Sequence, residues 1–300
     1  MYEINETFGK ITLKNISELK KHGYIIIRNL FNSNEVEFLE KACDLKKKGD
    51  TLTIDEFQNI TLSDKILDIF KMIIPNNIVY PCLSLNRSAD SPESEGEANS
   101  RVFHVDSIPD DFDYNVEYGI YNSGIYLSDH KKFSGGLKIR PFSINKKLEK
   151  TDTIFVRLKN IIKSLIKFNF KSILENLTFP KSINLDTQPG DLIIWSNRCH
   201  HSGHFRRLKL FPNISLEPFL ENFLPNFLFI KEPQSRRVIL TIYADEKSPY
   251  LEEYIKIQIN KFRRKEHYLK NEILSSNEQT FFKKGIIIRN DGYKYWSSKI

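Results

Sequence analysis

Two histidines and one aspartate lie in a pattern that could hold a metal ion. His104 and Asp106 are separated by one residue, Val105, at the end of a run typical of a β-strand. Because residues i and i+2 of a strand point to the same face, this imidazole and this carboxylate can reach one ion together. A second imidazole could come from His200 or His201, further along the chain. Adjacent residues of an extended segment point in opposite directions, so these two are alternatives.

Two imidazoles and one carboxylate on one face of an iron(II) ion leave three coordination positions open. A 2-oxo acid can occupy two of them and dioxygen the third. Arg236 and Arg237 open a strand-like run that ends at Tyr243. The planar fork of an arginine suits the distal carboxylate of 2-oxoglutarate. The pattern therefore predicts Fe(II), 2-oxoglutarate and O2 as the cofactor and co-substrates of an enzyme that oxidises a positioned C–H bond.

Two other functions use the same ligand types. One is a jelly roll that binds a metal or a sugar without catalysis. The other is a zinc hydrolase, because zinc also accepts two histidines and a carboxylate. A single histidine is more often structural than metal-bound, so the hypothesis depends on the order of the residues along strand-like segments.

The elements that must position these residues are mostly short strands separated by turn residues, which indicates a sandwich or barrel. Helices are expected after the N-cap signal at 32–35, over 61–73 and over 250–264. The polar run 88–100 is expected to be a loop. The expected strands are 24–28, 79–85, 101–106, 118–127, 136–139, 191–195 and 237–243.

The chain has 300 residues, of which 40% are hydrophobic, and this is enough for a sizeable core. We expect a mainly β, α+β fold in one oxygenase domain over residues 1–300. Its expected parts are a helical N-terminal part (1–75), a jelly-roll core (76–245) with insertions at 145–185 and 205–235, and a helical tail (246–300).

The formal net charge of +7 permits an acidic small molecule, an anionic membrane or a nucleic acid as partner. No helix-turn-helix, zinc finger or RNP-like motif is visible, so we expect no nucleic acid. The three cysteines form no disulfide framework, which indicates a reducing cytoplasm. We see no signal-peptide pattern and no apolar run of about 18 residues that could span a membrane.

Two segments leave open a peripheral contact with a membrane. Residues 158–177 form a basic amphipathic pattern with a lysine at every fourth position: Lys159, Lys163, Lys167 and Lys171. Residues 219–230 are aromatic and apolar, with Pro225 in their middle. A surface helix lying on the barrel explains the first segment more simply, and an interfacial helix on anionic lipid is the alternative.

From about Lys20 to Ala244 the chain resembles the phytanoyl-CoA dioxygenase family of iron(II)/2-oxoglutarate oxygenases. Residues 23–31 are similar to the family's opening strand, and His104-Val105-Asp106 matches its His-X-Asp motif. Residues 134–143 are similar to its Gly-rich segment, although Ile144 stands where the family usually has a histidine. Pro189-Gly190-Asp191 followed by His201 matches the strand that carries the distal histidine.

The resemblance implies a double-stranded β-helix (jelly roll, cupin-like) with iron at its open end. It implies the ligands His104, Asp106 and His201, because His201 lies ten residues after Asp191 (201 − 191), as in the family. The carboxylate ligand speaks against a halogenase, so the implied reaction is hydroxylation with release of succinate and CO2. The substrate would be a small organic, sugar-containing or lipid-linked molecule.

The residues that would bind 2-oxoglutarate are less well defined by the resemblance. The family's arginine lies closer to the distal histidine than Arg236, which is 35 residues past His201 (236 − 201). Arg237 is slightly preferred over Arg236, and Arg206 or Arg207 is the alternative at shorter spacing. Ser202 and Lys138 are further candidates for contacts to the co-substrate.

Overall fold

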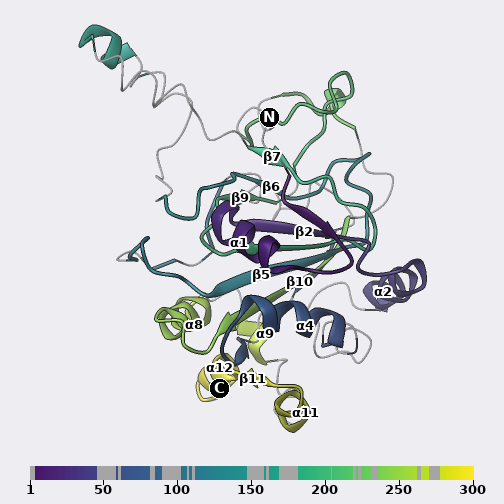
Figure 1. Ribbon diagram of the computed structural model, residues 1–300, viewed down its shortest axis with the longest axis vertical. Coiled ribbons are helices and arrows are strands. Elements are labelled where there is room, and N and C mark those ends of the chain that lie inside the picture. Colours follow the sequence, from purple (N-terminus) through teal and green to yellow (C-terminus); the bar gives the residue numbers. More distant parts are fainter. Residues whose placement is uncertain are drawn as a thin grey trace.

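The structure is a computed structural model in which two β-sheets face one another and helices cover the outer face of the larger sheet (Figure 1). Within the described residues, the larger sheet has eight strands and the smaller has three. The structure describes residues 4–45, 59, 62–81, 85–89, 103–106, 108–109, 112–146, 159, 162–168, 182–203, 205–218, 221, 224–230, 236–261, 265–269 and 278–300.

The larger sheet joins segments from the whole length of the chain. In spatial order its strands are β1 (Glu6–Phe8), β2 (Tyr24–Arg28), β8 (Leu192–Ser196), β5 (Ile120–Tyr126), β10 (Arg236–Asp245), β3 (Ile78–Tyr80) and β11 (Ile286–Ile288), while β4 (Leu85–Ala89) also pairs with β10. The smaller sheet has the order β7 (Ile183–Asn184), β6 (Lys138–Ile139) and β9 (His201–Ser202).

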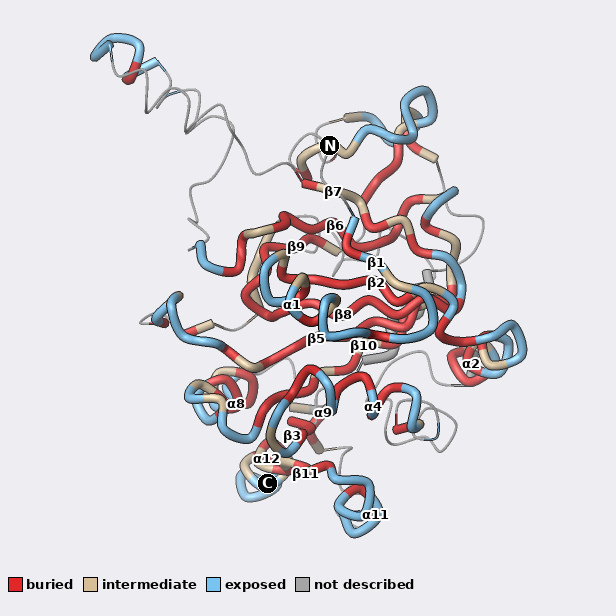
Figure 2. The backbone as a smooth tube through the Cα atoms, in the orientation of Figure 1, coloured by how far each residue is buried: buried red, intermediate tan, exposed pale blue. Residues whose placement is uncertain are grey.

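Strand alternation divides the core of the larger sheet between two faces. Side chains of one parity lie between the sheets, including Tyr24, Tyr126, Ile193, Trp195 and Val238. Side chains of the other parity pack under α1 (Leu13–His22), α2 (Ser33–Leu45) and α4 (Asp64–Ile73), including Ile25, Ile125, Ile194 and Ile239. The central strands are buried on both faces, which explains why they read as continuous apolar runs (Figure 2).

The C-terminal part packs around a separate aromatic cluster. Its helices α8 (Leu251–Ile259), α9 (Lys265–Leu269) and α12 (Asp291–Ser297) line this cluster, whereas α11 (Glu278–Lys283) packs through Phe281 in another cluster with β11. Tyr118, Tyr254, Tyr268 and Trp296 belong to this cluster and are at most 9% exposed. A short 3-10 helix, η3 (Asn226–Leu228), lies in the insertion after β9.

Several expectations differ from the structure. The expected strand over 101–106 is reduced, within the described residues, to an isolated bridge at His104, and Asp106 lies in a bend. The expected helical N-terminal part supplies, besides the expected strand β2, the strand β1, which pairs with β2 in parallel. The expected helical tail likewise supplies β11, which pairs with β3. Residues 88 and 89 of the expected loop instead end β4, where they pair with β10, and residues 90–100 lie outside the described residues.

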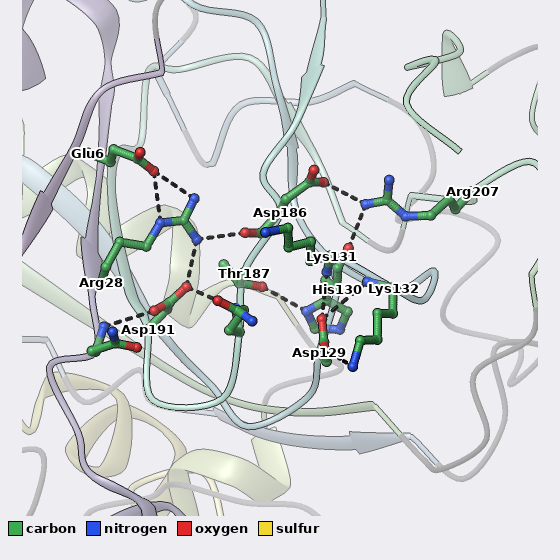
Figure 3. Close-up of polar contacts among 12 residues, drawn as sticks. Glu6, Arg28, Asp129, His130, Lys131, Lys132, Asp186, Thr187, Asp191 and Arg207 are labelled. Atoms are coloured by element: carbon green, nitrogen blue, oxygen red, sulfur yellow. Dashed lines mark hydrogen bonds and ion pairs between the residues drawn. The ribbon is translucent and has the colours of Figure 1, made fainter. Parts of the chain in front are cut away.

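The Pro-Gly-Asp turn fastens the start of β8 to the end of β2 (Figure 3). Gly190 has φ +91°, and a Cβ there would lie 2.3 Å from the carbonyl oxygen of Phe31, so only glycine fits. The fully buried Asp191 carboxylate accepts hydrogen bonds from Arg28 Nη1 (2.7 Å) and from the backbone N–H groups of Asn29 (3.0 Å) and Gln188 (2.9 Å). This turn therefore sets where β8, and the chain that leads on to β9, can lie.

A second set of contacts in the same view anchors the insertion that begins at residue 205 (Figure 3). The buried Arg207 guanidinium donates to Asp186 (2.5 Å) and to the carbonyl oxygen of His130 (2.6 Å). The His130 ring in turn lies 2.9 Å from the Thr187 hydroxyl. These contacts bind the insertion to the segment that precedes β8.

Candidate metal centre

His104, Asp106 and His201 come together although they lie far apart in the sequence. Each offers one ligand atom, and these atoms all lie within 4.8 Å of one another. His201 Nε2 is 3.2 Å from Asp106 Oδ2, and His104 Nε2 is 3.9 Å from Asp106 Oδ1. In the part of the chain that the structure describes, this is the group of histidine, cysteine and acidic side chains that could hold a metal ion.

Backbone hydrogen bonds set the positions of the three residues. The His104 N–H donates to the His201 carbonyl oxygen (2.9 Å), and the His201 N–H donates back to that of His104 (3.0 Å). Directly opposed residues of an antiparallel pair place their side chains on the same face, so the two imidazoles lie together. The Asp106 N–H donates to the Asn197 carbonyl oxygen (3.1 Å), which brings the carboxylate to the same edge.

The His201 ring is held in an orientation suited to metal binding. Its Nδ1 lies 2.9 Å from the carbonyl oxygen of Cys199, which accepts a hydrogen bond from this nitrogen, and its Nε2 faces Asp106 Oδ2 at 3.2 Å. His201 is buried, whereas the side chains of His104 and Asp106 are 41% and 33% exposed. The site therefore has a closed inner side and an open outer side.

The structure distinguishes the two adjacent histidines. His200 Nε2 lies 2.8 Å from the carbonyl oxygen of Lys146, and the His200 N–H donates to the Ser143 hydroxyl. His200 thus takes part in contacts away from Asp106, while His201 meets it. That His201, and not His200, binds a metal ion stays a prediction.

The electrostatics favour a charged carboxylate at the site. Burial raises the pKa of the Asp106 carboxyl, but the imidazoles of His201 and His104 and the hydrogen bonds from His201 and Asn122 outweigh it. The net pKa lies well below the ordinary value. An ionised carboxylate and two imidazoles whose Nε2 atoms lie near its oxygens fit the facial ligand set of iron(II), and zinc would accept the same donors.

Two candidates for contacts to 2-oxoglutarate lie on the other face of the smaller sheet. Lys138 and Ser202 are register partners, one position along from the paired residues Ile139 and His201. Strand alternation therefore turns both away from the metal site. The buried Lys138 ammonium instead binds Glu221 and the carbonyl oxygen of Leu216 in the insertion.

The fold also distinguishes the candidate arginines, because positions 236 and 237 lie on opposite faces of β10. Arg237 has the same parity as Ile239, which packs under the helices, and its Nη1 lies 3.4 Å from the carbonyl oxygen of Glu40 on α2. The Arg206 guanidinium stacks over the Phe229 ring at 3.6 Å and donates to the Glu221 carbonyl oxygen. Of Arg236 the structure describes only the backbone, at a position two residues before Val238 of the core between the sheets.

Asn122 also belongs to the site, although the sequence pattern did not indicate it. It is 6% exposed, and its Nδ2 donates to Asp106 Oδ2 over 2.8 Å. The only signal is an amide within a run that otherwise reads as a buried strand. Trp195 is 3% exposed, and its ring centroid lies 5.7 Å from that of His201. Arg198 donates to the carbonyl oxygens of Tyr114 and Val116.

No known family profile and no curated protein match this sequence. Solved structures do match it. The non-heme alpha ketoglutarate dependent carbocyclase SnoK from nogalamycin biosynthesis is 12% identical with a TM-score of 0.50, over 83% of this chain and 93% of that chain. HygX from Streptomyces hygroscopicus, with nickel, 2-oxoglutarate and hygromycin B bound, is 14% identical with a TM-score of 0.48, over 79% and 88%. EctD from S. alaskensis with bound Fe is 12% identical with a TM-score of 0.48, over 79% and 78%.

The similarity to SnoK shows the fold. The chain has the jelly-roll fold that this non-heme, alpha ketoglutarate dependent enzyme also has, with helices flanking the sheets. The predicted fold class is thus confirmed. None of the helices in the described residues is long and apolar enough to span a bilayer.

Proposed function

We propose that the chain is an iron(II)/2-oxoglutarate-dependent dioxygenase that hydroxylates a small organic, sugar-containing or lipid-linked substrate. The observation that carries this proposal is the convergence of His104, Asp106 and His201, whose ligand atoms lie within 4.8 Å of one another in a jelly roll. The order of the motifs along the chain supports a place in the phytanoyl-CoA dioxygenase family. We take residues 1–300 as one oxygenase domain.

In this proposal the three side chains would hold iron(II), and the loaded site would supply the oxidising chemistry that converts 2-oxoglutarate and O2 to succinate and CO2 as the substrate is hydroxylated. The hydrogen bond from His201 Nδ1 to the Cys199 carbonyl oxygen orients the ring so that Nε2 can bind the ion. The buried Trp195 ring packs edge-on against the His201 ring on the inner side of the site. The substrate approaches from the outer side, where His104 and Asp106 are exposed.

We further propose that Arg236, and not Arg237, pairs with the distal carboxylate of 2-oxoglutarate. Position 236 of β10 has the same parity as Val238, which lies between the sheets, while position 237 belongs to the helix-facing set. Arg236→Ala should raise the KM for 2-oxoglutarate by roughly 10- to 100-fold, the range for losing a charged hydrogen-bonded pair. Arg237→Ala is the matched control on the other face of the strand. A larger effect of Arg237→Ala would reverse the assignment.

The central test is an anaerobic titration with Fe(II) and 2-oxoglutarate, followed by an assay for succinate. We expect a weak visible charge-transfer band and succinate release that requires both O2 and 2-oxoglutarate. Asp106→Ala and His201→Ala should abolish both signals, while His200→Ala should have a milder effect. A band without turnover would favour a binding protein, and hydrolysis without O2 would favour a zinc hydrolase.

We also propose that the protein works in the cytoplasm at a membrane surface. Ile162, Leu165, Ile166 and Phe168 are 57%, 53%, 72% and 80% exposed, and Lys159, Lys163 and Lys167 are exposed beside them. Apolar side chains flanked by lysines suit an anionic lipid interface. In the second segment Phe227 is 68% exposed, whereas Phe229 is buried against Arg206.

Co-sedimentation with vesicles tests the membrane proposal. Binding to vesicles that contain phosphatidylserine, at low salt, should fall when Ile166 and Phe168 are both changed to Ser. Neutral phosphatidylcholine vesicles are the control for charge. Equal recovery of wild-type and variant protein with the anionic vesicles would contradict a role for this helix.

A further inference from the structure

Asn122 occupies an unusual position for an amide side chain. It lies within β5, all seven residues of which are buried, and its register partners are Trp195 of β8 and Ile242 of β10. Asparagine is disfavoured in strands, and burying an amide is costly unless it is hydrogen-bonded. An apolar residue would suit this position better, so the side chain requires a reason beyond packing.

The amide is directed at the proposed metal site. Its Nδ2 donates to Asp106 Oδ2 over 2.8 Å, and the same oxygen lies 3.2 Å from His201 Nε2. Asp106 itself lies in a bend and not in a strand. Its backbone is tied to the neighbouring chain by the bond from its N–H to the Asn197 carbonyl oxygen. Asn122, in contrast, belongs to a strand that is paired on both sides.

We propose that Asn122 is a positioning residue for Asp106: it holds the carboxylate in the orientation in which this residue can join His104 and His201 on one metal ion. This inference rests on the proposed function, because it takes Asp106 as a ligand. The hydrogen bond restricts rotation of the carboxylate about its Cβ–Cγ bond. Because Asn122 belongs to the rigid central sheet, this bond also limits the movement of Asp106, which lies in a bend.

The hydrogen bond from Asn122 to Asp106 also affects how many coordination positions of the metal ion remain open for the co-substrates. A carboxylate that binds an ion through both oxygens takes two positions, and the co-substrates then have fewer. Asn122 engages one oxygen and so favours attachment through a single oxygen. Its loss should therefore weaken metal binding and also reduce the fraction of metal-loaded protein that forms the complex with 2-oxoglutarate.

A matched control lies next to it. Ser123 is 1% exposed, and its hydroxyl donates to the Thr241 carbonyl oxygen over 3.3 Å on the opposite, helix-facing side of β5. Ser123→Ala removes a buried hydrogen bond from the same strand without touching the metal site. Asn122→Leu removes the amide at similar volume, and Asn122→Val is a second variant with a strand-favouring side chain.

The test measures Mn(II) binding by electron paramagnetic resonance, which requires no turnover. We expect Asn122→Leu and Asn122→Val to weaken Mn(II) binding by roughly 10- to 100-fold, the range for contacts that orient a ligand. Ser123→Ala should bind like the wild type. With Fe(II) and 2-oxoglutarate, the charge-transfer band of both Asn122 variants should be reduced even when the protein is saturated with metal.

Thermal unfolding of the metal-free variants shows whether each one is folded. The inference is overturned if a folded Asn122 variant binds Mn(II) within about threefold of the wild type, or if Ser123→Ala weakens binding as much. The proposed function fails separately if His201→Ala binds Mn(II) as tightly as the wild type. The two failures are thus distinguishable in one set of titrations.

Discussion

The Asp191 carboxylate should be a main source of stability, because it joins β2 to β8 from a fully buried position. Asp191→Ala removes the acceptor of three hydrogen bonds, one of them from the Arg28 guanidinium, whose side chain is 13% exposed. Breaking a buried ion pair from one side costs about 3–5 kcal/mol. Arg28 keeps its contacts to Glu6 and to the Asp186 carbonyl oxygen. We therefore expect the free energy of unfolding to fall by an amount near the lower end of this range, about 3 kcal/mol.

Urea denaturation followed by tryptophan fluorescence measures the free energy of unfolding of wild type and Asp191→Ala, and scanning calorimetry should show a lower Tm for the variant. A shift of about 2–4 °C per kcal/mol predicts a fall in Tm of roughly 6–12 °C. Glu37→Ala is the control, since its pair with Lys41 lies on the surface with side chains 63% and 72% exposed, and it should leave Tm unchanged. A loss for Asp191→Ala below about 1 kcal/mol, the size of one neutral hydrogen bond, would refute the reasoning.

The remaining predictions concern three other buried contacts. Gly190→Ala should lower Tm more than Asp191→Ala, because a Cβ would meet the Phe31 carbonyl oxygen at 2.3 Å, and an unchanged Tm would contradict that clash. Burial raises the pKa of the Cys199 thiol to about 12, so peptide mapping should show no alkylation by iodoacetamide at pH 8 unless the protein is first unfolded. Lys138→Met should destabilise the protein by about 3–5 kcal/mol by leaving Glu221 buried and unpaired, and the double change Lys138→Met with Glu221→Leu should restore most of the Tm.

Much of the architecture could be predicted from local patterns. The runs that became β2, β5, β8 and β10 are apolar and β-branched, and they form strands because both of their faces are buried. The strand expected over 101–106 was wrong within the described residues, because His104 pairs with a single residue and the chain then bends at Asp106. Local pattern does not reveal how many neighbours a segment will find.

The sequence by itself determined which side chains could act as metal ligands and their order along the chain. The alternation of a strand also separates Arg236 from Arg237 and Lys138 from Ile139, because neighbours in a strand face opposite sides. Which of the two sides becomes the inside depends on the sheets and helices that pack against it, and these come from distant parts of the chain. Only the tertiary structure could therefore turn Lys138 toward Glu221, Arg237 toward α2 and Asn122 toward Asp106.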